Sequence, residues 1–361
     1  MNHRERVRTA LDRHAPDRCP MQISFTPEFA ERLRNDMGVD GASLHNPHGG
    51  GNTYRLEREL DEDMLLTSVG WANSYYRNSE TYTDEWDVTF RVQPYETRFG
   101  SGSYTEMTGF PLSDAVMVDS YTPPDPTRPE LYHEADRMIA DYGDEYWIVG
   151  VTVTTIFETA WALRGLTQLL MDFVTDPDLA DRILDIPYRY HLEAAKRLVE
   201  RGVDMIWTGD DVGTQHGMMI APDLWRRFFK GRMADFFASL RAINPDIVIA
   251  YHSDGNIEPI VPDLIEIGLD VLNPVQPACM NPAVIKRRYG DKLSFWGTID
   301  EQHTLPFGTP DDVRIEVEDR IRTVGRGGGL ILGPTHHVQL DTPLENFRAM
   351  HNTILSTPCI R

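Results

Sequence analysis

Short apolar segments recur along the chain, and most are followed by a stretch with the periodicity of an amphipathic helix. Regular alternation of strand and helix predicts parallel pairing through right-handed crossovers. No long linker separates the segments, so residues 1–361 are expected to form one domain. The pattern favours a single (β/α)8 barrel of the TIM type and disfavours an open doubly wound sheet. The eight predicted strands are Met21–Phe25, Met64–Ser68, Trp147–Val153, Met205–Thr208, Val248–His252, Val271–Pro274, Ser294–Thr298 and Leu330–Leu332.

The boundaries of the predicted helices carry ordinary start and stop signals. The predicted helix Pro222–Ile243 has Asp223 in its first turn, and Asn244-Pro245 directly follows its end. Residues 69–115 interrupt the alternation of strands and helices. They have aromatic residues and threonines at alternate positions, which is typical of strands. We expect an inserted β-hairpin there, beside the mouth of the barrel.

Polar residues cluster directly after the predicted strands, where a (β/α)8 barrel carries its active site. Asp210 and Asp211 follow the fourth strand, and the fifth strand ends in His252 with Asp254 close behind. Up to four histidines and four aspartates would therefore meet in one cleft. The other candidates after the strands are Gln215, His216, Asn273, Gln276, Cys279, Thr298, Asp300, His336 and His337.

This crowding of acidic and imidazole groups indicates a metal site. Crowded carboxylates repel one another, so protons or a cation must lie among them. Neutral imidazoles beside carboxylates are good ligands for a divalent metal. His252, Asp254 and His336 could form an open site of two nitrogens and one oxygen, with positions left for water or substrate. The alternative is that these histidines only hydrogen-bond loop backbones and cap helices.

Three further residues leave two interpretations each. Trp71, in the aromatic group of the insertion, could line the barrel mouth for a flat ligand or only pack the insertion. Glu158 follows the third predicted strand and could point into the cleft or begin the next helix. Cys279 could be a ligand or a nucleophile, although a lone cysteine without a placed base is more often inert.

The formal net charge of −21 excludes some partners. Nucleic acid binding needs a basic face, and a polyanionic substrate would need basic residues concentrated in the cleft. The first twenty residues contain no apolar stretch that could act as a signal peptide, and the most apolar window, 148–163, is too polar to span a membrane. The three separated cysteines give no disulfide framework. We therefore expect a cytoplasmic protein that binds neither nucleic acid nor membrane.

Several separated runs, in the expected order, resemble the uroporphyrinogen decarboxylase superfamily. They are GDDVGTQHGMMIAPDLWRRFFKGRM, YHSDGNIEPIVPDLIEIGLDVLNPVQP, SFWGTID and LGPTHHVQLDTPLENF. The resemblance covers roughly residues 1–358 and implies a (β/α)8 barrel. The superfamily contains metal-free decarboxylases and zinc-dependent, corrinoid-linked methyltransferases that act on methanol, methylamines, methyl halides or aryl methyl ethers.

The two branches make different demands on this sequence. The decarboxylases hold the acetate and propionate groups of their substrate with arginines just after the first strand, where this chain reads PMQISFTPEF. They also have a histidine at the position of His336, six residues before Thr342-Pro343. The methyltransferases bind zinc through a His-x-Cys after strand five and a cysteine after strand eight. The resemblance places His252 at that histidine, and Asp254 and His336 at the two cysteines.

The resemblance therefore implies a metal-dependent methyltransferase or demethylase. It would move a methyl group from a small methoxylated or methylated substrate to a corrinoid on a partner protein. A site of nitrogen and oxygen ligands is harder than a thiolate site, which favours polarisation of an ether or hydroxyl oxygen by Zn²⁺ or another divalent ion. The expected acid–base residues are Asp210, Asp211 and His336, and the expected substrate-orienting residues are Gln215, Asn273, Gln276 and Trp71.

Two alternatives stay open at this point. One is a decarboxylase that acts on uroporphyrinogen or a smaller carboxylate, and the other is a non-catalytic barrel that binds a tetrapyrrole. The sequence also leaves open whether the chain forms a homodimer.

Overall fold

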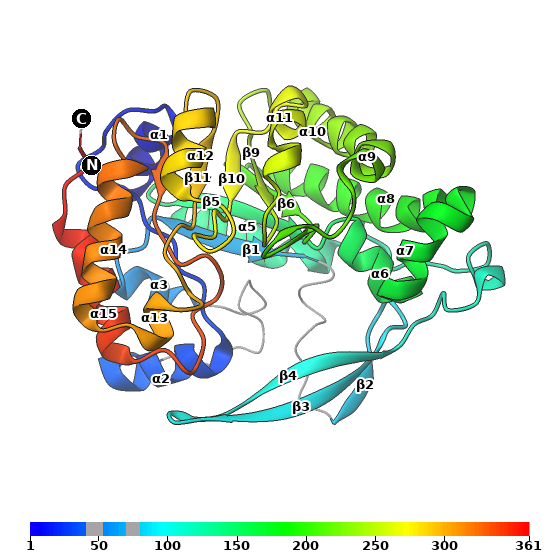
Figure 1. Cartoon of the computed structure of the whole chain (residues 1–361), viewed down its shortest axis with the longest axis horizontal. Helices are drawn as coiled ribbons and strands as arrows, with labels where there is room; N and C mark the ends of the chain where they lie inside the picture. Colours follow the sequence, from blue (N-terminus) through cyan, green and yellow to red (C-terminus); the bar gives the residue numbers. More distant parts are fainter. Residues whose placement is uncertain (41–52, 70–79, 361) are drawn as a thin grey trace.

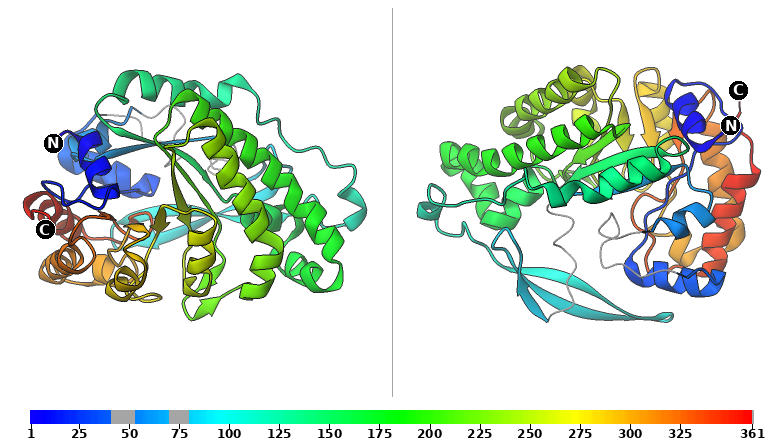
Figure 2. Two further views of the ribbon diagram at one scale, coloured as in Figure 1. Left: turned by 90° about the horizontal axis from the view of Figure 1, so that it is seen from above. Right: turned by 180° about the vertical axis from the view of Figure 1, so that it is seen from behind.

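A parallel β-sheet organises the molecule. The computed structural model describes residues 1–40, 53–69 and 80–360, and in these residues the sheet has seven strands in the order β1-β5-β6-β9-β10-β11-β12. The sheet curls into a partial barrel with helices along its outer face (Figures 1 and 2). The strands are β1 (Met64–Ser68), β5 (Trp147–Val153), β6 (Met205–Gly209), β9 (Val248–His252), β10 (Val271–Asn273), β11 (Ser294–Trp296) and β12 (Leu330–Ile331).

The helices lie where the sequence places amphipathic stretches. The predicted helix Pro222–Ile243 is one helical segment, in which a π-helical stretch over Arg226–Lys230 joins α9 to α10. The helices are α1 (His3–Leu11), α2 (Pro27–Met37), α3 (Arg55–Glu59), α5 (His133–Tyr142), α6 (Phe157–Arg164), α7 (Leu166–Thr175), α8 (Pro177–Arg201), α9 (Pro222–Trp225), α10 (Gly231–Ile243), α11 (Val261–Glu266), α12 (Pro282–Tyr289), α13 (Thr304–Phe307), α14 (Pro310–Thr323) and α15 (Leu344–Ser356). None of these helices has both the length and the apolar character needed to cross a bilayer.

Alternation along the strands divides the apolar core into two layers. Side chains of a strand point alternately to its two faces, so Trp147, Val149 and Val151 of β5 face the inside of the curled sheet, while Ile148 faces the helices. Trp207 and Trp296 belong to the same inner layer, and their ring centroids are 4.7 Å apart.

The prediction of a regular strand over Met21–Phe25 is wrong. Met21 and Phe25 form only isolated parallel bridges, to Leu332 and Val338. Side-chain carboxylates explain the difference, because they occupy the N–H groups that a neighbouring strand would use. The backbone N–H of Met21 donates to Asp63 Oδ2 at 2.7 Å, and the N–H of Ile23 donates to Glu62 Oε2 at 3.1 Å.

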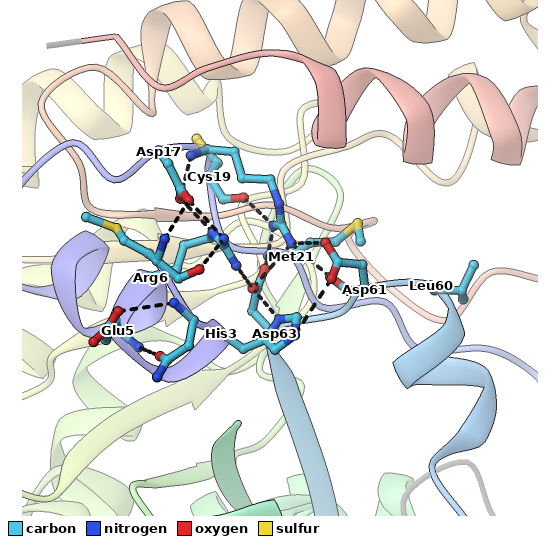
Figure 3. A network of polar contacts seen from close by, with 12 residues as sticks. His3, Glu5, Arg6, Asp17, Cys19, Met21, Leu60, Asp61 and Asp63 are labelled. Atoms are coloured by element: carbon cyan, nitrogen blue, oxygen red, sulfur yellow. Dashed lines mark hydrogen bonds and ion pairs between the residues drawn. The ribbon is translucent and has the colours of Figure 1, made fainter. Parts of the chain in front are cut away.

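A buried aspartate ties this segment to the rest of the sheet. Asp63, which precedes β1, is completely buried and lies at the centre of the network in Figure 3. It accepts hydrogen bonds from Arg6 Nη1 and Arg18 Nη1, each at 2.6 Å, and its own N–H donates to Met21 O at 2.9 Å. We call the junction of residues 20–25 with β1 the seam, and ionic contacts hold it where a ladder of backbone hydrogen bonds is missing.

Part of the insertion forms a separate antiparallel sheet, which runs across below the curled sheet toward α2 in Figure 1. Its strands are β2 (Thr81–Thr83), β3 (Thr89–Thr97) and β4 (Gly100–Gly109). Trp86 anchors its base to α8, where the Trp86 ring lies 4.7 Å from the ring of Tyr190. At the other end, the N–H of Ser103 donates to Glu28 of α2 at 3.1 Å.

Candidate functional site

The carboxyl ends of three neighbouring strands meet at one level of the sheet. Gly209 at the end of β6 pairs with His252 at the end of β9, and His252 pairs with Asn273 at the end of β10. Gly209 has a φ of +127°, and a Cβ there would lie 2.2 Å from the carbonyl oxygen of His252. Glycine is therefore required, and the backbone turn that it allows leads directly into Asp210 and Asp211.

Asn273 determines which nitrogen of His252 carries the proton. The Asn273 amide nitrogen donates to Trp296 O at 3.1 Å, so Asn273 Oδ1 faces the other way. That oxygen accepts from Trp207 Nε1 at 3.0 Å and lies 2.7 Å from His252 Nδ1. Because an amide oxygen can only accept, Nδ1 is the protonated nitrogen. The neutral ring therefore keeps the lone pair of Nε2, on the side of Asp211.

Asp211 and Asp254 meet His252 on that side. His252 Nε2 lies 3.6 Å from Asp211 Oδ1, and the same oxygen accepts the N–H of Asp254 at 2.7 Å. Ligand atoms of Asp211, His252 and Asp254 all lie within 4.8 Å of one another, and the three residues are half-buried. We call these three residues the acidic triad.

The acidic triad fits a divalent cation. One imidazole nitrogen with a fixed lone pair and two carboxylates form a donor set that suits zinc and harder divalent ions. Asp254 Oδ1 is buried and has no hydrogen-bond partner among the residues that the structure describes. An unsatisfied buried carboxylate oxygen is costly, and a bound cation would compensate it.

His336, which was predicted as a ligand together with His252 and Asp254, lies just outside the acidic triad. The ring centroids of His336 and His252 are 6.4 Å apart, and the ring of His337 lies 4.6 Å from that of His336. Burial raises the pKa of Asp254, and the charge of His336, when that ring is protonated, opposes the rise. The structure thus brings His252 and Asp254 together as predicted, and adds Asp211.

Two further carboxyl groups lie against the acidic triad. Burial raises the pKa of Asp210 to about 6, and this carboxylate accepts the N–H groups of Ile156 and Glu158 at the start of α6. Glu158 Oε2 accepts the N–H of Asp211 at 3.1 Å. Burial, reinforced by the charges of Asp211 and Asp210, raises the pKa of Glu158 well above its ordinary value. Both interpretations of Glu158 hold, because it lies in the first turn of α6 and its side chain contacts Asp211 of the acidic triad.

Glu301 is a residue that the sequence analysis did not single out. Burial, together with the charges of Asp254 and Asp341, raises the pKa of Glu301 to about 8. Its neighbour Asp300 was named instead, but the Asp300 carboxylate accepts the backbone N–H groups of Gln302 and His303 at 2.8 and 3.1 Å and so shapes the loop. The position of Glu301, shortly after the seventh predicted strand, could have identified it as a candidate site residue.

The residues predicted to orient the substrate have different surroundings. Asn273 and Gln276 are buried, and Gln276 Oε1 accepts the N–H of Gly255 at 2.5 Å, which fixes the loop after Asp254. Gln215 is exposed and donates to Gln302 at 3.2 Å. Trp71 lies outside the described residues.

Two more residues named from the sequence, His216 and Cys279, are not part of the acidic triad. His216 is exposed on the loop after Gln215. Cys279 Sγ is 3.5 Å from Gln276 Oε1, and burial, with smaller effects of Asp254 and Asp300, raises the pKa of its thiol. A thiol with a raised pKa is a weak nucleophile at neutral pH, so Cys279 is better suited to packing the loop than to attack.

Comparison with known proteins places the chain in a family. The family model "Uroporphyrinogen decarboxylase (URO-D)" matches residues 95–356, and no curated protein matches the chain. A methyltransferase from Methanosarcina mazei has a similar structure, with 20% sequence identity, a TM-score of 0.70 and coverage of 98% of each chain. A B12-independent methionine synthase from Shewanella sp. W3-18-1 is more distant, with 13% identity, a TM-score of 0.40 and coverage of 83% of this chain and 82% of its own. Because the family model spans well over half of the sequence, the chain belongs to the uroporphyrinogen decarboxylase (URO-D) family.

Proposed function

We propose that the protein is a metal-dependent methyltransferase or demethylase that passes a methyl group from a small methoxylated or methylated substrate to a corrinoid on a partner protein. The observation that carries the proposal is the acidic triad, Asp211, His252 and Asp254, with the lone pair of His252 Nε2 directed toward it. Family membership and a structural relative named as a methyltransferase support the same activity.

In this proposal the acidic triad would hold the divalent cation. When bound, the cation would supply Lewis-acid polarisation of an ether or hydroxyl oxygen of the substrate. Asn273 keeps the His252 ring in the required tautomer and orientation, as outer-shell partners of metal-binding histidines commonly do. Gln276 holds the backbone that carries Asp254 by accepting the N–H of Gly255.

Proton supply would come from the neighbouring carboxyl groups. Cleavage of a methyl ether leaves a basic oxygen, and a general acid near it lowers the barrier. Glu301, with a pKa of about 8, holds its proton at neutral pH, and burial raises the pKa of Glu158 well above its ordinary value. Burial and neighbouring carboxylates raise both pKa values, and at Glu158 the hydrogen bond from the N–H of Asp211 opposes the rise. Such surroundings favour a neutral or cationic substrate over a polyanionic one.

Metal analysis tests whether the acidic triad binds a divalent cation, which the proposal requires. Protein purified without a histidine tag should bind about one divalent ion per chain, with zinc as the first candidate. His252→Ala should lose the ion, whereas His216→Ala, which changes an exposed histidine, should keep it. Metal retained by His252→Ala would contradict the assignment of the acidic triad. Formation of coproporphyrinogen from uroporphyrinogen by metal-free protein would support the decarboxylase alternative instead.

A further inference from the structure

Two of the three cysteines lie in contact although they are separated by 340 positions in the sequence. Cys19 Sγ and Cys359 Sγ are 2.8 Å apart, and both cysteines are free thiols. The pair lies where the chain begins and ends, since the N- and C-termini are neighbours at one side of the molecule (Figures 1 and 2).

Backbone pairing brings the two thiols together. Arg18 and Pro358 form an antiparallel bridge, so the residues one step beyond them lie on the same face of the pair. The following residue, Ile360, is fixed as well, because its carbonyl oxygen accepts the N–H of Gly327 at 2.9 Å. The contact between Cys19 and Cys359 is therefore a consequence of ordered backbone on both sides.

The surroundings of the two thiols differ. Cys19 is 1% exposed, and its carbonyl oxygen accepts from Arg18 Nη1 in the network of Figure 3. The sulfur contact with Cys359, followed by burial, raises the pKa of the Cys19 thiol well above its ordinary value. Cys359 is half-buried and is thus the thiol that a reagent from solution meets first.

We propose that Cys19 and Cys359 form a thiol–disulfide modification site that takes a low-molecular-mass disulfide as its oxidant. The Cys359 thiolate attacks one sulfur of the small disulfide, so that a mixed disulfide forms and one small thiol leaves. The Cys19 thiol, which lies 2.8 Å from Cys359 Sγ, then attacks that sulfur, and its proton passes to the departing sulfur as the second small thiol leaves. The protein loses two hydrogens and two electrons in total, and the small disulfide is reduced to two thiols.

The geometry permits this bond with little rearrangement. Sulfurs of a disulfide lie about 2.05 Å apart, so the two sulfurs have to approach by less than about 1 Å. The bond would link the segment that enters the seam to the residues that follow α15, and it would close nearly the whole chain into one loop. A loop of this length restricts the unfolded chain strongly, so oxidation should stabilise the fold.

Oxidised glutathione is the probe for this proposal. The full-length protein, equilibrated with it, should lose two hydrogens by intact mass, and peptide mapping should link the peptide of Cys19 to that of Cys359. Its Tm should rise by about 5 °C, and dithiothreitol should reverse both changes. Cys359→Ser should show neither change, whereas Cys279→Ser, the matched control, should behave like the wild type.

Two outcomes would overturn the proposal. In one, the wild-type protein keeps a stable glutathione adduct on Cys359 without forming the internal bond. In the other, Cys19 and Cys359 both stay reduced at glutathione ratios that oxidise a dithiol peptide in the same solution. If Cys359→Ser folds poorly, Cys359→Ala replaces it as the variant, and peptide mapping of the wild-type protein shows directly whether the internal disulfide forms.

Discussion

Asn273 shows how one side chain can set the chemistry of another. Its amide is hydrogen-bonded through both the nitrogen and the oxygen, since Nδ2 donates to Trp296 O and Oδ1 accepts from both Trp207 and His252. Its position at the end of a predicted strand, on the active-site side of the barrel, predicts that Asn273 orients the substrate. The structure shows its amide bonded within the protein, and only three-dimensional contacts among the ends of β6, β10 and β11 reveal this.

Asn273→Ala should weaken metal binding without removing a ligand. The His252 ring would lose the acceptor that fixes its tautomer, and loss of such a partner commonly lowers metal affinity about 10- to 100-fold. A competition titration with a chromophoric chelator measures the change. Gln215→Ala, at an exposed position that was also predicted to orient the substrate, should leave the affinity unchanged. Equal affinities for Asn273→Ala and the wild type would show that the hydrogen bond to Nδ1 has no role in binding.

At the scale of elements, apolar periodicity predicts the strands well wherever backbone pairs with backbone. Seven of the predicted segments form the parallel sheet, with ends that differ by no more than two residues. The segment Met21–Phe25 has the same apolar pattern, but the carboxylates of Asp63 and Glu62 accept the N–H groups of Met21 and Ile23. A pattern of apolar residues contains no information about such side-chain competition. The sequence pattern also places single site residues after separate strands, but it contains no information about which of their side chains meet. The acidic triad was therefore not predicted.

Replacement of Asp63 should lower the free energy of unfolding by weakening the seam. Asp63→Asn would leave the buried guanidinium groups of Arg6 and Arg18 without their shared carboxylate, and loss of one partner of a buried ion pair typically costs about 3–5 kcal/mol. Urea unfolding should show this loss in the free energy of unfolding. Asp17→Asn is the control, because Asp17 pairs with the same Arg6 but has a side chain that is 45% exposed, and its loss should cost about 1 kcal/mol or less. Similar losses for the two variants would contradict the role of Asp63.

At the scale of the whole molecule, acid should destabilise the fold partly through one buried histidine. His191 on α8 is 1% exposed, and burial lowers its pKa from 6.5 to about 3. Below pH 6.5 the unfolded chain takes up a proton on this residue, whereas the folded protein does not until about pH 3. The free energy of unfolding should therefore fall by about 1.4 kcal/mol per pH unit across this window from this residue alone.

His191→Gln tests that contribution. Between about pH 7 and pH 5 the wild-type protein should lose about 2 kcal/mol more stability than the variant, because glutamine has no proton to gain. Urea unfolding at both pH values gives the two differences, and the lower overall stability of the variant cancels in the comparison. Parallel pH profiles for both proteins would mean that His191 titrates alike in the folded and unfolded states.

Methyl transfer to a corrinoid is the most direct test of the account. Metal-loaded protein, kept strictly anaerobic, is mixed with cob(I)alamin and a panel of methoxylated and methylated small molecules, and methylcobalamin is read from its absorption spectrum. The account predicts methylcobalamin with at least one neutral or cationic donor, and at least about a hundred-fold slower formation with His252→Ala than with His216→Ala. A metal-loaded, folded protein that forms no methylcobalamin from any donor, or a His252→Ala variant as active as the wild type, would contradict it.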